Sequence, residues 1–448
     1  MDRRPLNVTN VIDESPLSRF QFRVFLLCAL IIFLDGIDYQ VIGIAAPLIS
    51  KEFGILRSSL GLIFGAGALG AGAGGLLLGL LADRLGRKRT LVIATLWFGS
   101  TTLAATLCTT SEQFIILRFL TGIGLGGAIP CCIALTSEYA PRHRRATIVS
   151  LLWAAFPLGA MVGGFINAFL VQQYGWATLF HVWGLIPVLV AAGLVFWMPE
   201  SVKYLLTRGN RMDAARSIIA SITLKPVENL GALIDVEERV VGAQLQSLFT
   251  QGRAIGTLSV WVALFTIIGS LTTVAMWAPS LITSHGFSTK EAALVVGLNG
   301  LGSFVGTASA GWLIERIGVA RCAIPAFILA AVAALAFGNA IDVSFWALAI
   351  AAVMVGFFMG VGSSGAIAMS AVVYPTAIRS TGVGWANGMG RFGSALGPLV
   401  VGRMVGNQAT SHEIFMAMAT ALLVAVPCVW VLAAYVQKRN SSALSLGH

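Results

Sequence analysis

The stretch FRVFLLCALIIFLDGIDYQVIGIAAPLI, residues 22–49, is longer than the roughly 20 apolar residues that a helix needs to cross a bilayer. Two carboxylates, Asp35 and Asp38, interrupt it near its middle. Because they are three residues apart, a helix places them on one face. A charge at this depth costs several kcal/mol, and intramembrane acids usually mark a path for ions or substrates. The stretch therefore predicts a membrane helix with a functional acidic face.

Long apolar runs of this kind make up most of the chain. Of its 448 residues, 57% are hydrophobic and 11% are charged, whereas a soluble globular protein has about 25% charged residues. The 50 glycines suit closely packed membrane helices. The predicted fold class is therefore all-α, a polytopic membrane protein with twelve transmembrane helices in two six-helix bundles. We place the spans near residues 22–49, 60–82, 90–109, 113–136, 147–170, 178–198, 256–282, 292–314, 322–340, 345–372, 382–404 and 413–436.

Basic residues are concentrated on one predicted side of the membrane. With the N-terminus taken as cytoplasmic, 23 of the 29 Lys and Arg residues fall in tails and loops on that side, and four fall on the other. The remaining two, Arg118 and Arg391, lie inside predicted spans. The positive-inside rule then predicts a multi-pass protein of the bacterial cytoplasmic (inner) membrane with both termini in the cytoplasm. The net charge of +10 thus reflects topology in a lipid bilayer, and we predict no nucleic-acid partner.

One long polar interval divides the chain into two sets of six spans. The predicted organisation, in chain order, is a cytoplasmic N-terminal tail (1–21), an N-terminal six-helix bundle (22–198), a central cytoplasmic loop (199–255), a C-terminal six-helix bundle (256–436) and a cytoplasmic C-terminal tail (437–448).

The two sets of six spans carry matching motifs. GLLADRLGRK (79–88) follows the second span of the first set, and GWLIERIGVAR (311–321) follows the second span of the other. A proline followed four residues later by arginine, first at Pro141 and again at Pro375, also recurs between the fourth and fifth spans of each set. These echoes predict parallel repeats with a binding site between them near the membrane midplane.

At this point the sequence resembles the major facilitator superfamily. The GxLxDRxGRK loop at 79–88, its weaker copy and the run from Arg118 to Gly127 carry the resemblance over nearly the whole chain. Within that superfamily, LDGID (34–38) and GRFGSALGP (390–398) are similar to elements of the aromatic acid/proton symporters, which import benzoate, hydroxybenzoates and phenylpropionates. PESVKYL (199–205) resembles a sugar-porter segment, but the PETKG-like element of that group is absent.

The buried acids and one arginine are the predicted proton-coupling residues. A desolvated pair such as Asp35 and Asp38 can hold a proton and titrate as a unit. Arg118 could pair with either carboxylate, contact the substrate, or have a purely structural role. The alternative for the two acids is a structural hydrogen-bond pair that caps a neighbouring helix.

Arg391, near mid-depth in the eleventh span, is the predicted counter-ion for an anionic substrate, because a guanidinium stays charged and binds a carboxylate through two hydrogen bonds. The alternative is a structural pair with a carboxylate of another helix. Aromatic and amide side chains at similar depth are expected to sandwich a ring and bind its substituents, although most membrane aromatics serve packing. These further candidates are Tyr39, Trp153, Phe156, Trp277, Asn299, Trp385 and Asn387.

Charged residues at the cytoplasmic ends of the helices are the predicted gate. The glycines of the loop motif permit a tight turn between helices. Its charges are expected to join the two halves through ion pairs that break when the protein opens inward; the alternative is a set of solvated loop charges. The predicted gating residues are Asp83, Arg84, Gly86, Arg87, Lys88, Glu138, Arg145, Glu315, Arg316 and Arg379.

The sequence thus predicts a monomeric proton-coupled symporter that imports aromatic carboxylates by alternating access. Two alternatives stay open: a symporter for a non-aromatic organic acid, and a transporter-like sensor of such acids. An enzyme is not expected, because the sequence has no nucleotide loop and no nucleophile–base arrangement. No cofactor or metal site is predicted, and the six scattered cysteines are interpreted as small hydrophobic residues.

Overall fold

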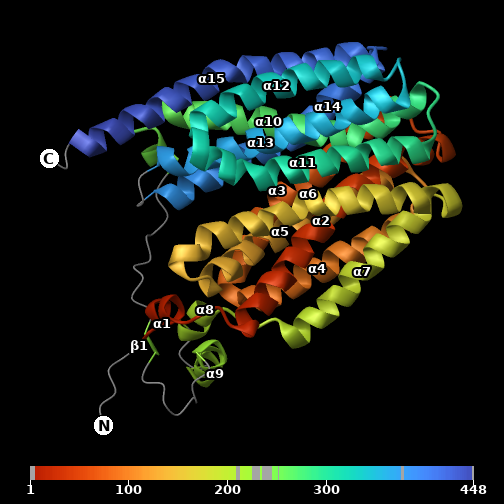
Figure 1. The fold of residues 1–448 in the computed structure, drawn as a ribbon. Helices are drawn as coiled ribbons and strands as arrows, with labels where there is room; N and C mark the ends of the chain where they lie inside the picture. The colour runs from red at the N-terminus through yellow and green to blue at the C-terminus, as the bar shows by residue number, and fades with distance from the viewer. Residues whose placement is uncertain are drawn as a thin grey trace, which may run out of the picture.

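The computed structural model describes residues 6–207, 212–223, 233–234, 245–250, 252–374 and 378–445. Its main elements are long helices that run roughly alongside one another (Figure 1). The first set comprises α2 (Arg19–Glu52), α3 (Leu60–Leu85), α4 (Arg87–Ala104), α5 (Ser111–Tyr139), α6 (Arg142–Tyr174) and α7 (Trp176–Trp197). The second set comprises α10 (Ala254–Ser284), α11 (Thr289–Ile317), α12 (Val319–Ala340), α13 (Phe345–Val373), α14 (Arg379–Gly406) and α15 (Ser411–Ser445).

Each long helix contains most or all of one predicted span, so the predicted all-α fold class is confirmed. Among the described residues, 11 helices are long and apolar enough to cross a membrane. The twelfth, α14, falls below that level of hydropathy because glycines, Asn387 and Arg391 interrupt its apolar residues. Its polarity follows from its position between the bundles, where it packs on α3 and α10.

Helix packing in the first set recurs in the second. The pairs α2–α6, α3–α5 and α4–α7 correspond to α10–α14, α11–α13 and α12–α15. Between the sets, α6 packs on α11, α3 packs on α14, and α2 meets α10. The first two contacts are equivalent, because each joins the fifth long helix of one set to the second long helix of the other. This arrangement is that of two parallel repeats related by an axis along the helices.

The repeated loop motif adopts the same turn in both halves. Gly86 ends α3 with φ 98°, and Gly318 ends α11 with φ 87°. A side chain at such a positive φ is strained, so glycine is required where one helix reverses directly into the next. The expected tight turn is therefore present at both copies.

α2 begins and α15 ends at one end of the helices, here called the terminal face; the other end, where α2 and α10 finish, is the distal face (Figure 1). In Figure 1 the two sets of ribbons separate toward the terminal face. Among the described glycines, every close approach between the bundles lies in the distal half. A Cβ on Gly61 would lie 2.7 Å from the Pro398 oxygen, and one on Gly164 would lie 2.4 Å from the Gly297 Cα. The bundles are therefore closed together at the distal face.

Short elements cover the terminal face of the first bundle. The predicted N-terminal tail contains β1 (Leu6–Asn7) and α1 (Val8–Glu14), and the described parts of the predicted central loop contain α8 (Val202–Thr207), α9 (Met212–Thr223), β2 (Leu233–Ile234) and a 3-10 turn (Leu245–Leu248). β1 pairs with β2 in parallel. Val8, Ile12 and Ile219 are buried in one cluster with residues of α2 and α5. These polar segments carry enough apolar residues at helical spacing to fold onto the bundle. Two further 3-10 turns, Arg57–Ser59 and Ala105–Leu107, join long helices.

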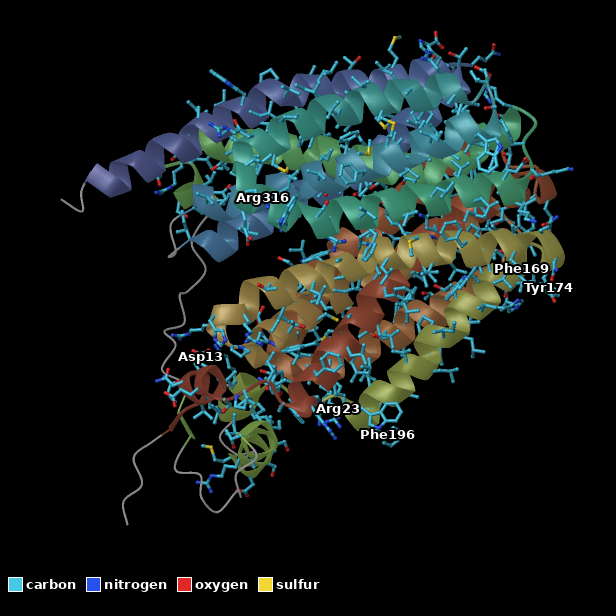
Figure 2. The ribbon with its side chains drawn as sticks, in the orientation of Figure 1. Asp13, Arg23, Phe169, Tyr174, Phe196 and Arg316 are labelled. Carbon is cyan, nitrogen blue, oxygen red and sulfur yellow. The ribbon has the colours of Figure 1, made fainter. Side chains whose placement is uncertain are left out.

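Large apolar side chains point outward from the bundles. Phe169 of α6 is 57% exposed and Phe196 of α7 is 81% exposed, and the Phe196 ring projects away from the ribbons in Figure 2. Asp13 and Arg316 lie toward the terminal face in the same view. An apolar outer surface with polar ends is what a helix bundle needs in a bilayer, where its backbone groups are satisfied within each helix.

Candidate functional site

The centre of the first bundle holds a buried ion pair. Asp38 of α2 accepts hydrogen bonds from the two terminal nitrogens of Arg118 of α5, at 3.2 and 2.9 Å. Asp38 is 1% exposed and Arg118 is 4% exposed. Gly67 of α3 lies beside the guanidinium, where a Cβ would be 3.6 Å from its nitrogen. The geometry is a bidentate guanidinium–carboxylate pair, which compensates both charges away from water.

Asp35 lies one helical turn before Asp38 on α2. Its carboxylate is 9% exposed and lies within electrostatic range of Arg391, Asp38 and Arg118. Arg391 of α14 is half-buried. Within the described residues, no direct hydrogen bond or ion pair joins Asp35 to Arg391. The two bundles therefore place one acid and one arginine near each other without a closed salt bridge.

Tyr39 completes this junction between the bundles. Its ring meets that of Phe156 of α6 edge to face, with centroids 5.5 Å apart. Its hydroxyl lies beside the hydroxyls of Thr272 on α10 and Ser394 on α14. Thr272 donates a hydrogen bond of 2.9 Å to Ser394. The junction thus combines aromatic faces, hydroxyls, a carboxylate and a guanidinium, which is the chemistry needed to bind an aromatic acid.

Three other predicted substrate residues lie away from this junction. Trp277 is 1% exposed near the distal face, where its indole donates to the Pro398 carbonyl and its ring meets Phe64 at 5.4 Å. Asn299 is 3% exposed and donates to the Ala352 carbonyl, which ties α11 to α13. Trp385 is 42% exposed and stacks on Trp261.

The other two predicted substrate residues flank the junction on its helices. Asn387, one turn before Arg391, is half-buried and donates to the Val383 carbonyl of its own helix. Trp153 is half-buried on α6, nearly one turn before Phe156. These two residues share a helix with Arg391 and Phe156, respectively.

At the terminal face, the loop motif is fastened to its own bundle. Arg87 forms an ion pair with Glu138, and Glu138 also accepts a hydrogen bond of 2.6 Å from Ser201. The Glu200 carboxylate accepts the backbone N–H of Lys88 at 3.0 Å. These contacts join α4, α5 and the segment before α8.

Sequence reasoning missed the part that residues 199–205 take in this network. Besides Glu200 and Ser201, Tyr204 contributes a hydrogen bond of 3.1 Å from its hydroxyl to the Arg84 carbonyl. Tyr139 donates to the Glu200 carbonyl at 2.6 Å. The signal lies in the PES element at 199–201. Thr272 and Ser394 were also missed, because single hydroxyls in apolar spans are common.

The remaining predicted gating residues lie near the ends of their helices at the terminal face. Asp83 and Arg84 are exposed. In the second bundle, Glu315 is exposed and the Arg316 guanidinium lies 4.5 Å above the Trp312 ring. Arg145 is half-buried in the first turn of α6. Arg379 is the first residue of α14, but the Arg379 side chain lies outside the described part of the structure, as does Pro375.

No group of three or more His, Cys, Asp or Glu side chains in the described part of the chain could hold a metal ion. The described chemistry is thus that of a polar junction between two helix bundles. Its guanidinium can bind an anionic group.

The sequence comparisons identify relatives over most of the chain. The family model of the Major Facilitator Superfamily matches residues 28–337 and 260–447. The 4-hydroxybenzoate transporter PcaK of Pseudomonas putida is 36% identical over 396 residues, 88% of each chain. The benzoate transport protein of Acinetobacter baylyi is 30% identical and covers 96% of this chain and 93% of its own length. The 3-(3-hydroxy-phenyl)propionate transporter of Escherichia coli is 31% identical over 91% of this chain and 92% of its own.

Solved structures support the same assignment at the level of the fold. The xylose transporter XylE of E. coli, in a partially occluded inward-open conformation, superposes with a TM-score of 0.73 at 20% identity, covering 92% of this chain and 98% of its own. The apolar helices of the present protein and its match to this family identify it as a multi-pass membrane transporter and not an enzyme. The chain belongs to the major facilitator superfamily.

Proposed function

We propose that this protein is a proton-coupled symporter that imports aromatic carboxylates, of the benzoate or hydroxybenzoate class, across the bacterial cytoplasmic membrane. The relatives that transport 4-hydroxybenzoate, gallate and benzoate support the substrate class. The observation that carries the mechanism is the proximity of Asp35 to Arg391 across the two bundles.

In the proposed mode of binding, Arg391 holds the substrate carboxylate through two hydrogen bonds. The ring lies against Tyr39 and Phe156, and the hydroxyls of Thr272 and Ser394 are available to a ring substituent. Because both bundles contribute to the site, a bound substrate is contacted by each half. This is the geometry that alternating access around a central site requires.

Coupling follows from competition for Arg391. When Asp35 is ionised, its charge balances Arg391 inside the protein. When Asp35 binds a proton, Arg391 is left as an uncompensated, half-buried cation, which is costly until the substrate carboxylate takes the place of that charge. Proton and substrate are therefore carried together or not at all, and one proton per monoanion makes the cycle electroneutral.

Asp38 and Arg118 have a supporting role in this scheme. Their bidentate pair compensates the charge of Asp38, so Asp35 is the acid that faces the substrate. The pair also fixes α2 against α5, which sets the position of Asp35 and Tyr39. We assign proton coupling to this group of three, with Asp35 as the exchanging site.

The terminal face is proposed to be cytoplasmic, with both termini inside, on the strength of the positive-inside rule. The distal closure of the bundles then corresponds to an inward-facing state. The terminal-face network of Arg87, Glu138 and Glu200 is proposed to make inter-bundle contacts, including those of Arg316 and Arg379, when the protein opens to the outside. The protein is proposed to act as a monomer, with two domains at residues 22–198 and 256–436 that rock about the central site.

The test uses purified protein in liposomes with labelled 4-hydroxybenzoate and an acidic exterior. Wild-type protein accumulates label only with the proton gradient. Asp35→Asn abolishes accumulation but retains exchange of external for internal substrate, because a permanently neutral side chain leaves Arg391 free. Arg391→Gln abolishes both activities.

Two matched variants control for charge and folding. Arg403→Gln removes an exposed arginine from the distal end of the same helix, and Asp342→Asn removes an acid that is 66% exposed. Both are expected to transport normally. Normal accumulation by Asp35→Asn or Arg391→Gln would contradict the assigned roles, and competition by aliphatic acids but not by benzoate would exclude the aromatic substrate class.

A further inference from the structure

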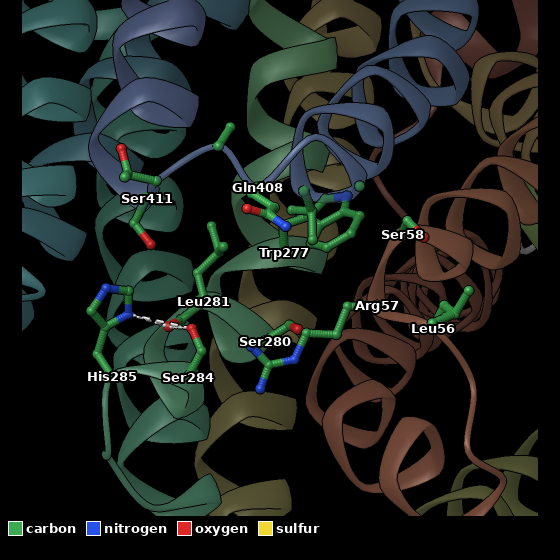
Figure 3. A pocket seen from close by; sticks show the side chains of 14 residues that line it. Leu56, Arg57, Ser58, Trp277, Ser280, Leu281, Ser284, His285, Gln408 and Ser411 are labelled. Atoms are coloured by element: carbon green, nitrogen blue, oxygen red, sulfur yellow. Dashed lines mark hydrogen bonds between the residues drawn. The ribbon is translucent and has the colours of Figure 1, made fainter.

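A pocket of about 520 Å³ opens on the distal face, well away from Arg391 (Figure 3). One wall is the 3-10 turn before α3, with Leu56, Arg57 and Ser58. The other walls are the last two turns of α10 and the connection from α14 to α15. The volume exceeds that of a single-ring acid, so such a molecule fits with water around it.

The pocket has the polar groups of an anion site. Arg57 is exposed, and its guanidinium has no hydrogen bond or ion pair among the described residues. Figure 3 shows its side chain extending across the pocket toward α10, where Ser280 and Ser284 lie. Among the described residues that line the pocket, none carries a carboxylate. A guanidinium that faces hydroxyls and no acid favours a carboxylate ligand.

An aromatic residue forms the inner end of this pocket and separates it from the centre. Trp277 lines it and packs edge to face on Phe64 of the first bundle. Behind them, α3 and α14 approach so closely that a Cβ on Gly61 would meet the Pro398 backbone. A ligand in the pocket is therefore accessible from the distal side only.

The pocket exists because the bundles are closed there. Arg57 belongs to the first bundle, whereas Ser280, Ser284 and Gln408 belong to the second. If the distal ends separate, the two walls separate with them. A ligand that contacts both walls binds the closed arrangement better than the open one, and so shifts the equilibrium toward the closed arrangement.

We propose that this pocket is a second binding site for aromatic carboxylates, and that its occupancy holds the distal ends of the bundles together. The inference rests on the proposed function for its ligand and for the outward orientation of the distal face. It assigns the site a regulatory effect: at high external concentration the substrate slows its own uptake, because the bundles must separate distally to accept the next molecule at Arg391.

The experiment measures the initial rate of gradient-driven 4-hydroxybenzoate uptake in liposomes, from below to far above half-saturation. For wild-type protein the rate rises and then falls. The uptake rate of Arg57→Gln rises to a plateau at or above the wild-type maximum and does not fall, and the half-saturation of its rising phase is unchanged. Arg57→Lys keeps the charge but loses the bidentate geometry, so its fall begins at higher concentration.

Lys51→Gln is the matched control, because it removes an exposed distal cation that does not line the pocket. It is expected to match wild-type protein. A wild-type rate that saturates without falling, or a fall that persists in Arg57→Gln, would overturn the second site while leaving the proposed function intact. An Arg57→Gln protein with weakened half-saturation and an unchanged fall would also overturn it, because Arg57 would then serve the transport site. Absence of any uptake by wild-type protein would instead refute the proposed function, and this inference with it.

Discussion

Asp38→Asn is the substitution whose cost the structure defines best. The variant replaces the partner of a buried arginine with a neutral amide that can accept only one of its two hydrogen bonds. Removing one member of a buried ion pair costs about 3–5 kcal/mol, because the other charge is left uncompensated. Since an amide oxygen remains, we expect a loss near the lower limit, about 3 kcal/mol in the free energy of unfolding.

The pairing predicts that a second substitution recovers part of this loss. In Asp38→Asn/Arg118→Gln, neither residue of the pair carries a charge and the two amides can hydrogen-bond. Contacting residues show coupling energies of about 0.5–3 kcal/mol, and a bidentate pair at 2.9 and 3.2 Å belongs near the upper end. The double variant is therefore expected to be more stable than Asp38→Asn alone.

The assay is equilibrium unfolding of the purified protein in mixed micelles, monitored by tryptophan fluorescence and by far-ultraviolet circular dichroism. Asp342→Asn is the matched control, since that acid is 66% exposed and its contact with His285 is 3.5 Å. It should change the stability little. A double variant no more stable than Asp38→Asn, or an Asp38→Asn protein as stable as wild type, would refute the reasoning.

Three further substitutions test other contacts. Gly164→Leu places a side chain where a Cβ alone comes within 2.4 Å of the α11 backbone, so it should abolish 4-hydroxybenzoate uptake, whereas Gly72→Ala, with nothing within 4 Å, should leave uptake unchanged. Glu200→Ala removes the acceptor of two backbone N–H groups and should lower the free energy of unfolding by about 1–3 kcal/mol, while exposed Glu14→Ala should not; equal stabilities would contradict the network. Tyr39→Phe deletes a hydroxyl that meets two others in the second bundle, and about 1 kcal/mol lost from binding would raise the half-saturation concentration roughly fivefold. An unchanged half-saturation concentration would exclude this hydroxyl from the site.

The fold was largely predictable because each membrane helix corresponds to a long apolar run in the sequence. The glycine motif also predicted its turn, since the positive φ of Gly86 and Gly318 is a local property of the chain. The short helices on the terminal face were not predicted. Their segments are polar on average, and only contact with the first bundle buries Val8 and Ile219.

The central site was predictable in part. Charged residues in apolar runs are conspicuous, so Asp35, Asp38, Arg118 and Arg391 could be selected from the sequence. Which acid pairs with Arg118 could not be read from spacing, because it depends on how α2 is rotated against α5.

The aromatic candidates show the same limit. Trp277 and Phe156 are both aromatic residues within predicted spans, and the sequence does not distinguish their roles. In the structure, Trp277 packs in the distal closure, whereas Phe156 meets Tyr39 beside the central acids. Depth along a helix can be counted from the sequence, whereas the direction of a side chain depends on tertiary packing.

The central claim is that the proton on Asp35 and the substrate on Arg391 are carried together. It is tested most directly by recording the pH of a weakly buffered suspension of liposomes as 4-hydroxybenzoate is added. The account predicts that the external medium becomes more alkaline as wild-type protein takes up 4-hydroxybenzoate. It also predicts that Asp35→Asn exchanges external for internal substrate without any change in the external pH. Uptake of the label by wild-type protein at constant external pH, or continued proton movement in Asp35→Asn, would contradict it.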